Sequence, residues 1–230
     1  MKRTALLLAS ALALAAGSAS AAGQPKGPFA GAVHAVGALA GKDGSPISLT
    51  WDRGRITGLS SSSITLTRRD EAQVTFAITA STVVRNGGAT YPLSDLKTGL
   101  VATVVSEAGD ALVVRRIRGD GAPSGADPSA FAGPAAKAID GTIDVQDADG
   151  SHATYDYDRG RIQSVGGGSL TIVRPDKQTV TLALDASTIV RDAGRTESVG
   201  DLVPGERAMF FSQAGLLKLV RCVHSGRAGR

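Results

Sequence analysis

The stretch Asp52-Arg53-Gly54-Arg55-Ile56 returns further along the chain as Asp158-Arg159-Gly160-Arg161-Ile162, a shift of 106 residues (158 − 52). The match continues without a gap, and of the 67 positions from 52 to 118, 28 are identical in the second copy. Two copies in one register indicate one fold that is present twice. Each residue can therefore be compared with its counterpart 106 positions away.

Within each copy, apolar and polar residues alternate with a period of two, which is the pattern of a half-buried strand. Turn signals recur about every 8–12 residues, the spacing of a small sandwich or barrel. In the first copy, strands are expected at residues 47–51, 64–67, 74–79, 82–85, 100–106 and 111–118, with at most one helical turn at 93–96.

Short strands in a small domain leave exposed edges unless the sheet closes on itself. The sequence therefore predicts an all-β protein of two tandem, small, Greek-key-like (OB-like) β-barrels with five to six strands each. A pair of open meanders is the alternative. Bends and tight turns are expected at Gly54, Gly99 and Gly109 and at their counterparts Gly160, Gly205 and Gly215.

Residues 1–21 have the pattern of a secretory signal peptide, with a basic start, an apolar run from Ala5 to Ala16 and small residues at Ala19 and Ala21. The apolar run is shorter than the roughly 20 residues that a membrane-spanning helix needs. We therefore expect a protein exported to the periplasm, the cell envelope or the medium, with no transmembrane segment in the mature chain. The expected order is a first repeat at 31–119, a Pro/Gly/Ala-rich linker at 120–136 and a second repeat at 137–225.

The formal net charge of +4 falls to +2 without the signal peptide, because residues 1–21 contain Lys2 and Arg3 and no acidic residue. The resulting near-balance argues against a nucleic-acid partner, although the pI of the whole sequence is near 9.5. Cys222 is the only cysteine, so no internal disulfide is expected. Its counterpart is Arg116, so the duplicated fold does not require a thiol at this position.

Each copy has the order Gly-Arg-Ile, a Ser- or Gly-rich turn, Thr alternating with Ile or Leu, then Ala-Ser-Thr-x-Val-Arg, Asp-Leu-x-x-Gly and a final Val-Arg. This pattern resembles a bacterial family of exported domains of unknown function, and the resemblance extends over nearly all of both repeats. It implies a small OB-like barrel in each copy. The family has no established chemistry, so the resemblance implies no catalytic residue.

The sequence contains no arrangement typical of an active site. The three histidines, His34, His152 and His224, form no close pair or cluster. Cys222 and His224 share a strand face, but two residues along a strand span about 7 Å, which is too far for a direct nucleophile–base contact. We therefore expect no catalytic residue and no enzymatic activity.

A partial calcium-loop pattern is present at Asp147, Asp149, Gly150 and Asp156. The first loop position falls on Val145, which has no side-chain oxygen, and the first copy lacks most of the carboxylates. An Asp-Gly hairpin turn explains the same residues. We therefore expect no metal and no cofactor.

Arginine recurs more regularly between the copies than any other polar residue. Arg115 and Arg221 share a strand face with apolar residues, so we expect them to be partly buried and to need a carboxylate partner. The predicted partner is Asp52 or Asp95 for Arg115, and Asp158 or Asp201 for Arg221. This Arg–Asp clip is the favoured interpretation, and an anion-binding groove is the alternative.

An aromatic residue precedes the repeated motif in both copies, as Trp51 and Tyr157. An aromatic ring beside basic residues is how OB folds stack bases or sugars. Aromatic residues make up only 4% of the chain, which favours packing in the core or at its rim for these two. If a ligand binds, the candidate residues are Trp51, Arg53, Arg55, Tyr157, Arg159 and Arg161.

These observations favour a non-enzymatic, exported, tandem β-barrel binding module of the cell envelope. Two linked binding sites gain avidity when both can engage together. The expected partner is an unidentified envelope component or protein. The alternative is a structural or assembly protein of the envelope without a small-molecule ligand.

Overall fold

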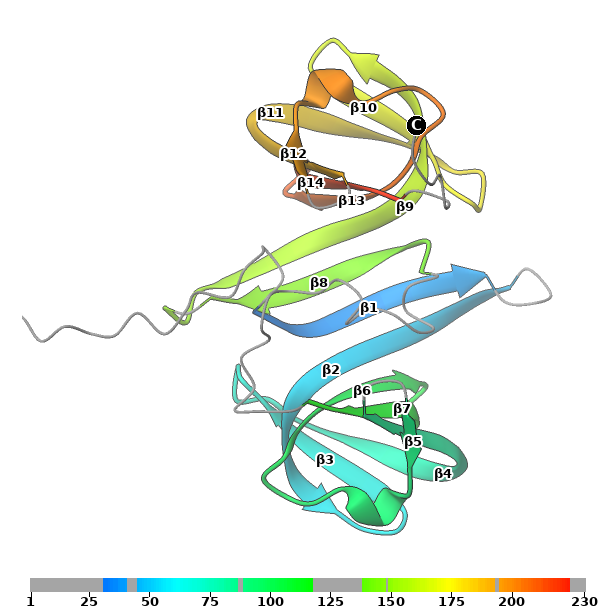
Figure 1. Cartoon of the computed structure of the whole chain (residues 1–230), viewed down its shortest axis with the longest axis vertical. Coiled ribbons are helices and arrows are strands. Elements are labelled where there is room, and N and C mark those ends of the chain that lie inside the picture. Colours follow the sequence, from blue (N-terminus) through cyan, green and yellow to red (C-terminus); the bar gives the residue numbers. More distant parts are fainter. Residues whose placement is uncertain are drawn as a thin grey trace, which may run out of the picture.

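The computed structural model describes residues 31–40, 45–86, 89–117, 138–147, 149–192 and 195–223. The predicted signal peptide (1–21), the predicted linker (120–136) and His224 lie outside the described residues. Within them the chain is all-β, as predicted, and consists of strands and two 3-10 turns (Figure 1). The described part of the chain has no helix with the length and hydrophobicity that crossing a bilayer requires.

The described strands of the two copies follow one another in the same order. The first copy contains β1 (Ala32–Ala40), β2 (Pro46–Leu59), β3 (Ser63–Arg68), β4 (Gln73–Asn86), β5 (Ala89–Tyr91), the turn η1 (Leu93–Asp95), β6 (Val101–Glu107) and β7 (Asp110–Arg116). The second copy contains β8 (Asp140–Gln146), β9 (His152–Gly166), β10 (Ser169–Val173), β11 (Thr179–Asp192), β12 (Arg195–Glu197), the turn η4 (Val199–Asp201), β13 (Arg207–Gln213) and β14 (Leu216–Cys222).

In each copy, five strands pair in a closed order, so that each has two hydrogen-bonded neighbours. The first ring is β2–β3–β4–β7–β6 and back to β2. The second ring is β9–β10–β11–β14–β13 and back to β9. The β4–β7 and β11–β14 pairs are parallel, and the other pairs are antiparallel. Closed pairing removes the open edges that a flat sheet of short strands would expose.

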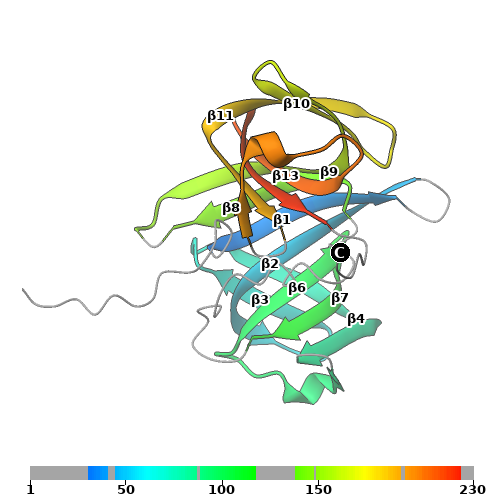
Figure 2. The ribbon, with the colours of Figure 1, turned by 45° about the horizontal axis from the view of Figure 1, so that its top comes forward.

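Strands β1 and β8 lie outside the rings and connect them (Figures 1 and 2). β1 pairs with the first half of β2, β8 pairs with the first half of β9, and β1 and β8 pair with each other in antiparallel register. The result is a four-stranded bridging sheet in the order β2–β1–β8–β9. Val36 lies opposite Thr142, which is also its counterpart in the second copy (36 + 106 = 142). The bridging strands are therefore related by an approximate twofold axis through this pair.

The repeated motif lies where β2 and β9 pass from the bridging sheet into a ring. A Cβ atom on Gly54 would lie 2.5 Å from the carbonyl oxygen of Thr67, and one on Gly160 would lie 2.9 Å from that of Val173. Both distances are shorter than a van der Waals contact. Glycine is therefore the residue that lets the long strand approach its neighbour so closely.

Three clusters of buried apolar side chains stabilise the fold. The first ring contains Ile56, Ile64, Leu66, Phe76, Val84, Leu96, Ala102, Val104, Ala111 and Val114. The second ring contains Ile162, Leu170, Ile172, Leu182, Val190, Leu202, Ala208, Phe210, Leu217 and Val220. The third cluster lies between the rings and contains Ala32, Ala35, Trp51, Ala138, Ile143, Val145, Tyr157, Phe211 and Leu219. Because the third cluster draws residues from both copies, its burial favours their association.

The observed strands differ from the expected ones in three respects. Residues 74–79 and 82–85, expected as two strands, form the single strand β4, whose pairing with β7 shifts register. The strand expected at 47–51 extends through the repeated motif as β2. β1 and β8 have no counterpart among the expected strands, because they are rich in Ala, Gly and Asp, which have low strand propensity. The three-residue strands β5 and β12 also have no counterpart among them.

We predict that Gly54→Ala lowers the free energy of unfolding by about 2 kcal/mol, because the new Cβ would collide with the β3 backbone. The control is Gly200→Ala, where the new Cβ would meet only the Ser198 hydroxyl at 3.5 Å. The control is expected to change stability by less than about 0.5 kcal/mol. Urea unfolding followed by circular dichroism measures both, and equal effects would contradict the close approach.

Candidate functional site

The bridging sheet has a polar face on the side opposite the third apolar cluster. Strand alternation and register place twelve side chains on it in three rows. The rows are Ser48, Ala38, Asp140 and Asp158; Thr50, Val36, Thr142 and Asp156; and Asp52, His34, Asp144 and Thr154. We call this surface the bridge face. Its twelve residues include five aspartates and one histidine, and none is lysine or arginine.

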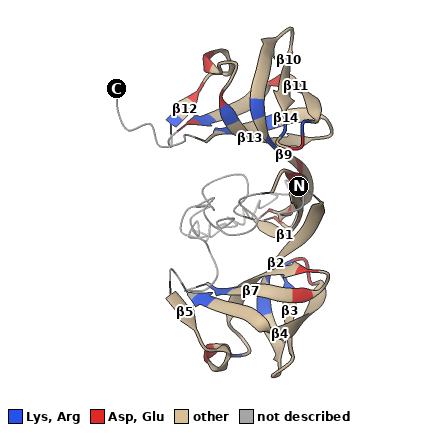
Figure 3. Ribbon diagram, turned by 90° about the vertical axis from the view of Figure 1, so that its right-hand side faces the viewer, with Lys and Arg blue, Asp and Glu red and all other residues tan. Residues whose placement is uncertain are grey.

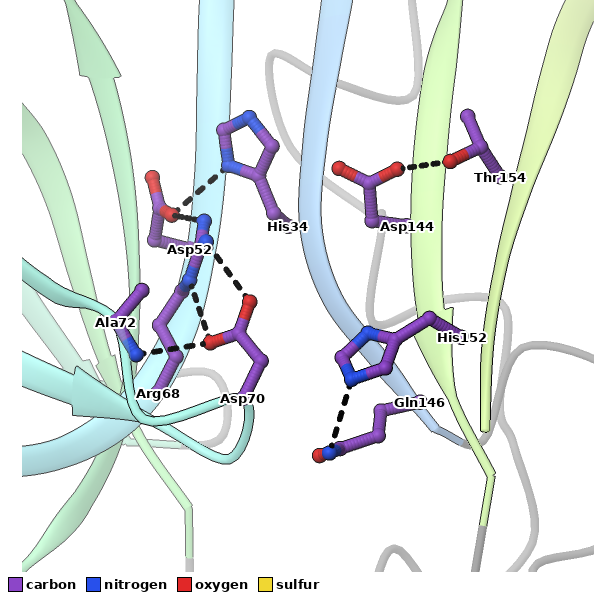
Figure 4. Close-up of polar contacts among 9 residues, drawn as sticks. All are labelled: His34, Asp52, Arg68, Asp70, Ala72, Asp144, Gln146, His152 and Thr154. Atoms are coloured by element: carbon purple, nitrogen blue, oxygen red, sulfur yellow. Dashed lines mark hydrogen bonds and ion pairs between the residues drawn. The ribbon is translucent and has the colours of Figure 1, made fainter. Parts of the chain in front are cut away.

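At the first-ring end of the bridge face, the Asp52 side chain is almost fully buried, with 2% exposed. Its Oδ1 accepts hydrogen bonds from His34 Nδ1 at 2.8 Å and from Arg68 Nη1 at 3.0 Å (Figure 4). Arg68 also donates from Nε and Nη2 to the two oxygens of Asp70, at 3.1 and 2.8 Å. Arg68 thus partners a carboxylate that would be costly to bury alone.

The second-ring end of the bridge face repeats this arrangement. Arg174 Nη1 donates to Asp158 Oδ1 at 3.1 Å, and Nε and Nη2 donate to the two oxygens of Asp176 at 3.2 and 2.6 Å. The two ends differ at one position. His34, which donates to Asp52, is replaced by its counterpart Asp140, whose Oδ2 forms an ion pair with Arg174 Nη1 at 2.6 Å. The pKa of Arg174 is raised, and the hydrogen bond to Asp176 is the largest cause.

The second-ring end is more acidic than the first. Asp140 and Asp156 stand where the first copy has His34 and Thr50. The single guanidinium of Arg174 is therefore accompanied by four carboxylates, those of Asp140, Asp156, Asp158 and Asp176. Burial raises the pKa of Asp158, Arg174 opposes this effect, and the charges of Asp140 and Asp156 raise the pKa further. This end of the face therefore has an excess of negative charge.

An open groove of about 480 Å³ lies at this acidic end. Its lining comes from all four bridging strands and from Arg174 and Val180 of the second ring. Gly37 and Gly141, which are paired across β1 and β8, contribute only backbone to it. Ala38, a small residue on the bridge face, also lines the groove, whereas its counterpart Asp144 does not. The groove thus belongs to one end of a nearly symmetric sheet.

Of the six residues predicted to bind a ligand, Tyr157 alone lines this groove. Its ring packs 5.3 Å from that of Phe211, its hydroxyl donates to the Ala138 carbonyl at 3.3 Å, and burial raises its pKa to about 12. Trp51 is buried in the same apolar cluster. Both aromatic residues therefore pack in a core, which is the interpretation that the sequence favoured for them.

The four predicted ligand-binding arginines lie on β2 and β9. Arg55 and Arg161 are exposed, and each donates from Nη1 to a backbone carbonyl, of Gly99 at 2.7 Å and of Gly205 at 2.6 Å. This repeated bond ties the long strand to the loop before β6 or β13. Arg53 and Arg159 are half-buried. Burial, and then the nearby charge of Arg69, lower the pKa of Arg53. Ligand binding by these four side chains stays a prediction.

A repeated Arg–Asp ion pair is present, with Asp52 and Asp158 as its carboxylates and Arg68 and Arg174 as its guanidinium groups. Arg115 and Arg221 each follow a fully buried valine of a ring core, so strand alternation directs them to the other side of the strand. Asp95 and Asp201 are exposed in η1 and η4, and Asp201 accepts a hydrogen bond from the Ser198 N–H at 2.9 Å. Ion pairs of Arg115 or Arg221 with these aspartates stay predictions.

The sequence-based candidates did not include Arg68, Asp70, Arg174 or Asp176. The signal that identifies these residues is the Arg-x-Asp sequence at 68–70, which recurs at 174–176. The pairing of β2 with β3 places Arg68 opposite Gly54. The guanidinium of Arg68 thereby reaches Asp52, which is two residues from Gly54 on β2. This contact depends on strand register, which the sequence pattern does not specify.

Among the described residues, no group of three His, Cys, Asp or Glu side chains could hold a metal ion. In the partial calcium-loop pattern, Asp149 Oδ1 accepts hydrogen bonds from the backbone N–H and the hydroxyl of Ser151, at 2.9 and 2.7 Å. Gly150 has a φ of +88°, which favours glycine at this turn. The arrangement is that of an Asp-Gly turn.

The two rings and the shared bridging sheet define a tandem all-β protein in which one structural unit is present twice. The sequence model of a domain of unknown function (DUF5666) matches residues 53–114 and 159–207, once in each copy. The chain is therefore similar to this family in both halves, and β1 and β8 lie outside the two matches. No curated protein matches the chain.

We predict that Arg174→Met lowers the free energy of unfolding by about 3 kcal/mol, because Asp158 and Asp140 lose their shared cation in a partly buried position. The control is Arg161→Met, which removes a hydrogen bond at an exposed side chain. It is expected to cost about 1 kcal/mol or less. Urea unfolding measures both variants, and similar losses would show that the ion pair does not stabilise the second ring.

Proposed function

We propose that the protein is a non-enzymatic binding module of the cell envelope, exported by its signal peptide, with two OB-like barrels formed by the rings. The ring pairing order, with one parallel contact among antiparallel ones, supports the barrel assignment. The main support for binding is the groove on the bridge face. The groove is built from both copies, so an intact bridging sheet is required to form it.

The chemistry of the described side chains supports a binding role over a catalytic one. Burial, and then the charges of Glu206, Asp192 and Glu197, raise the pKa of Cys222 to about 11. Little thiolate is therefore present at neutral pH, although thiolate is the nucleophilic form. At the bridge face, the carboxylates of Asp52 and Asp158 accept hydrogen bonds from Arg68 and Arg174, so each already has a structural partner.

The chain from Ala22 to Arg230 is predicted to cosediment with envelope fractions from the source organism. Ser48→Trp, which places a large ring at the exposed rim of the groove, is expected to weaken this binding at least tenfold. The matched control is Ser94→Trp in the exposed turn η1, which lies off the bridge face, and its binding should stay within about twofold of the unmodified chain.

Two results would contradict the proposal. The first is that the unmodified chain binds no envelope fraction. The second is that Ser48→Trp and Ser94→Trp bind as well as each other. Assembly of the unmodified chain into large particles in sedimentation, without envelope binding, would favour the structural or assembly role instead.

A further inference from the structure

The bridging sheet differs in charge from the rest of the chain. Its four segments, β1, β8, residues 46–52 of β2 and residues 152–158 of β9, contain five aspartates and no lysine or arginine. The whole chain has 25 lysines and arginines against 21 acidic residues. In Figure 3 the basic positions lie on the strands of the two rings, and the bridging strands between them show none. The bridge face is thus an acidic surface on a protein whose overall charge is slightly positive.

Ion pairs neutralise only part of this acidic surface. Arg68 serves Asp52 and Arg174 serves Asp158 and Asp140, but no ion pair among the described residues involves Asp144 or Asp156. Asp144 accepts a hydrogen bond from the Thr154 hydroxyl at 2.6 Å, and Asp156 is exposed beside the groove. These two carboxylates are therefore accessible to a cation supplied by a partner.

The two copies differ at three of the acidic positions of the bridge face. The counterparts of Asp140, Asp144 and Asp156 are His34, Ala38 and Thr50, none of which is acidic. Because both copies form the same ring and the same bridging strand, the fold does not require carboxylates at these positions. The acidic groove is an addition to the shared fold and not a consequence of it.

The geometry of the face fits an extended polypeptide. Asp144 lies opposite Thr154, so Asp144 and Asp156 are diagonal neighbours on the antiparallel strands β8 and β9, at a spacing of about 7–8 Å. An extended segment with Lys or Arg at alternate positions has a similar repeat, of about 6.6–6.8 Å. Val36 and Val180 supply apolar lining for the aliphatic parts of such side chains.

We propose that the bridge face binds an extended, Lys- or Arg-bearing segment of a partner polypeptide, with its cationic groups on Asp144 and Asp156. This rests on the proposed binding function and names the chemistry of its ligand. Complementary charge selects the partner and speeds the encounter. A nucleic acid is repelled by the same face.

The test uses the chain from Ala22 to Arg230 and a fluorescent ten-residue peptide of alternating Lys and Thr, in 50 mM salt. Asp144→Asn/Asp156→Asn is expected to raise the Kd, measured by anisotropy, at least tenfold. The matched control is Glu107→Gln/Asp110→Asn, which makes the same charge change at the exposed β6–β7 turn and should raise the Kd less than about twofold. Unfolding midpoints of both variants verify that each is folded.

Four results would overturn the proposal. One is a Kd above 1 mM for the unmodified chain, and another is equal weakening by the two double variants. The third is equally tight binding of spermidine, because this would show attraction of cations in general and not recognition of a peptide. If Asp144→Asn/Asp156→Asn binds envelope fractions as well as the unmodified chain does, the peptide proposal fails while the envelope-binding function stands.

Discussion

The antiparallel pairing of β1 with β8 is the contact on which the arrangement of the two copies depends. Each of these strands already pairs with the long strand of its own copy, so without the β1–β8 contact each would expose a free edge and one side of the third apolar cluster. The pairing satisfies both edges at once and buries residues from both copies. Because Val36 and Thr142 are counterparts, the contact has the self-complementary form of a twofold interface, built within one chain.

The repeated motif connects this bridging sheet to the rings. Its aspartate receives Arg68 or Arg174, its glycine allows the close approach of β3 or β10, its second arginine holds the loop before β6 or β13, and its isoleucine enters the ring core. Four of the five motif positions thus have a structural role that is the same in both copies. This explains why they recur where other positions do not. Functional differences are accordingly expected at positions that the copies do not share, and the acidic groove lies among such positions.

Much of the fold is predictable from the sequence, because the duplication and the alternation of residues such as Ile64, Thr65 and Leu66 are visible in it. The bridging sheet is not predictable in this way, because the Ala- and Gly-rich β1 has weak strand propensity. It becomes a strand through its pairing with β2, 6 to 18 residues away, and with β8, about 106 residues away. The candidate site follows the same division. Asp52 and Asp158 are recognisable from their repetition, but their pairing with Arg68 and Arg174 depends on the register of β2 and β9, and the groove depends on contact between the copies.

The central claim is that the bridging sheet makes the two copies one rigid unit. Residual dipolar couplings of backbone amides in the two rings, measured on the chain from Ala22 to Arg230 in a weakly aligning medium, test it most directly. A single alignment tensor is predicted to fit the couplings of both rings, with the relative orientation that the β1–β8 pairing imposes. Two tensors of different magnitude or orientation would show that the rings tumble separately, and would contradict the account.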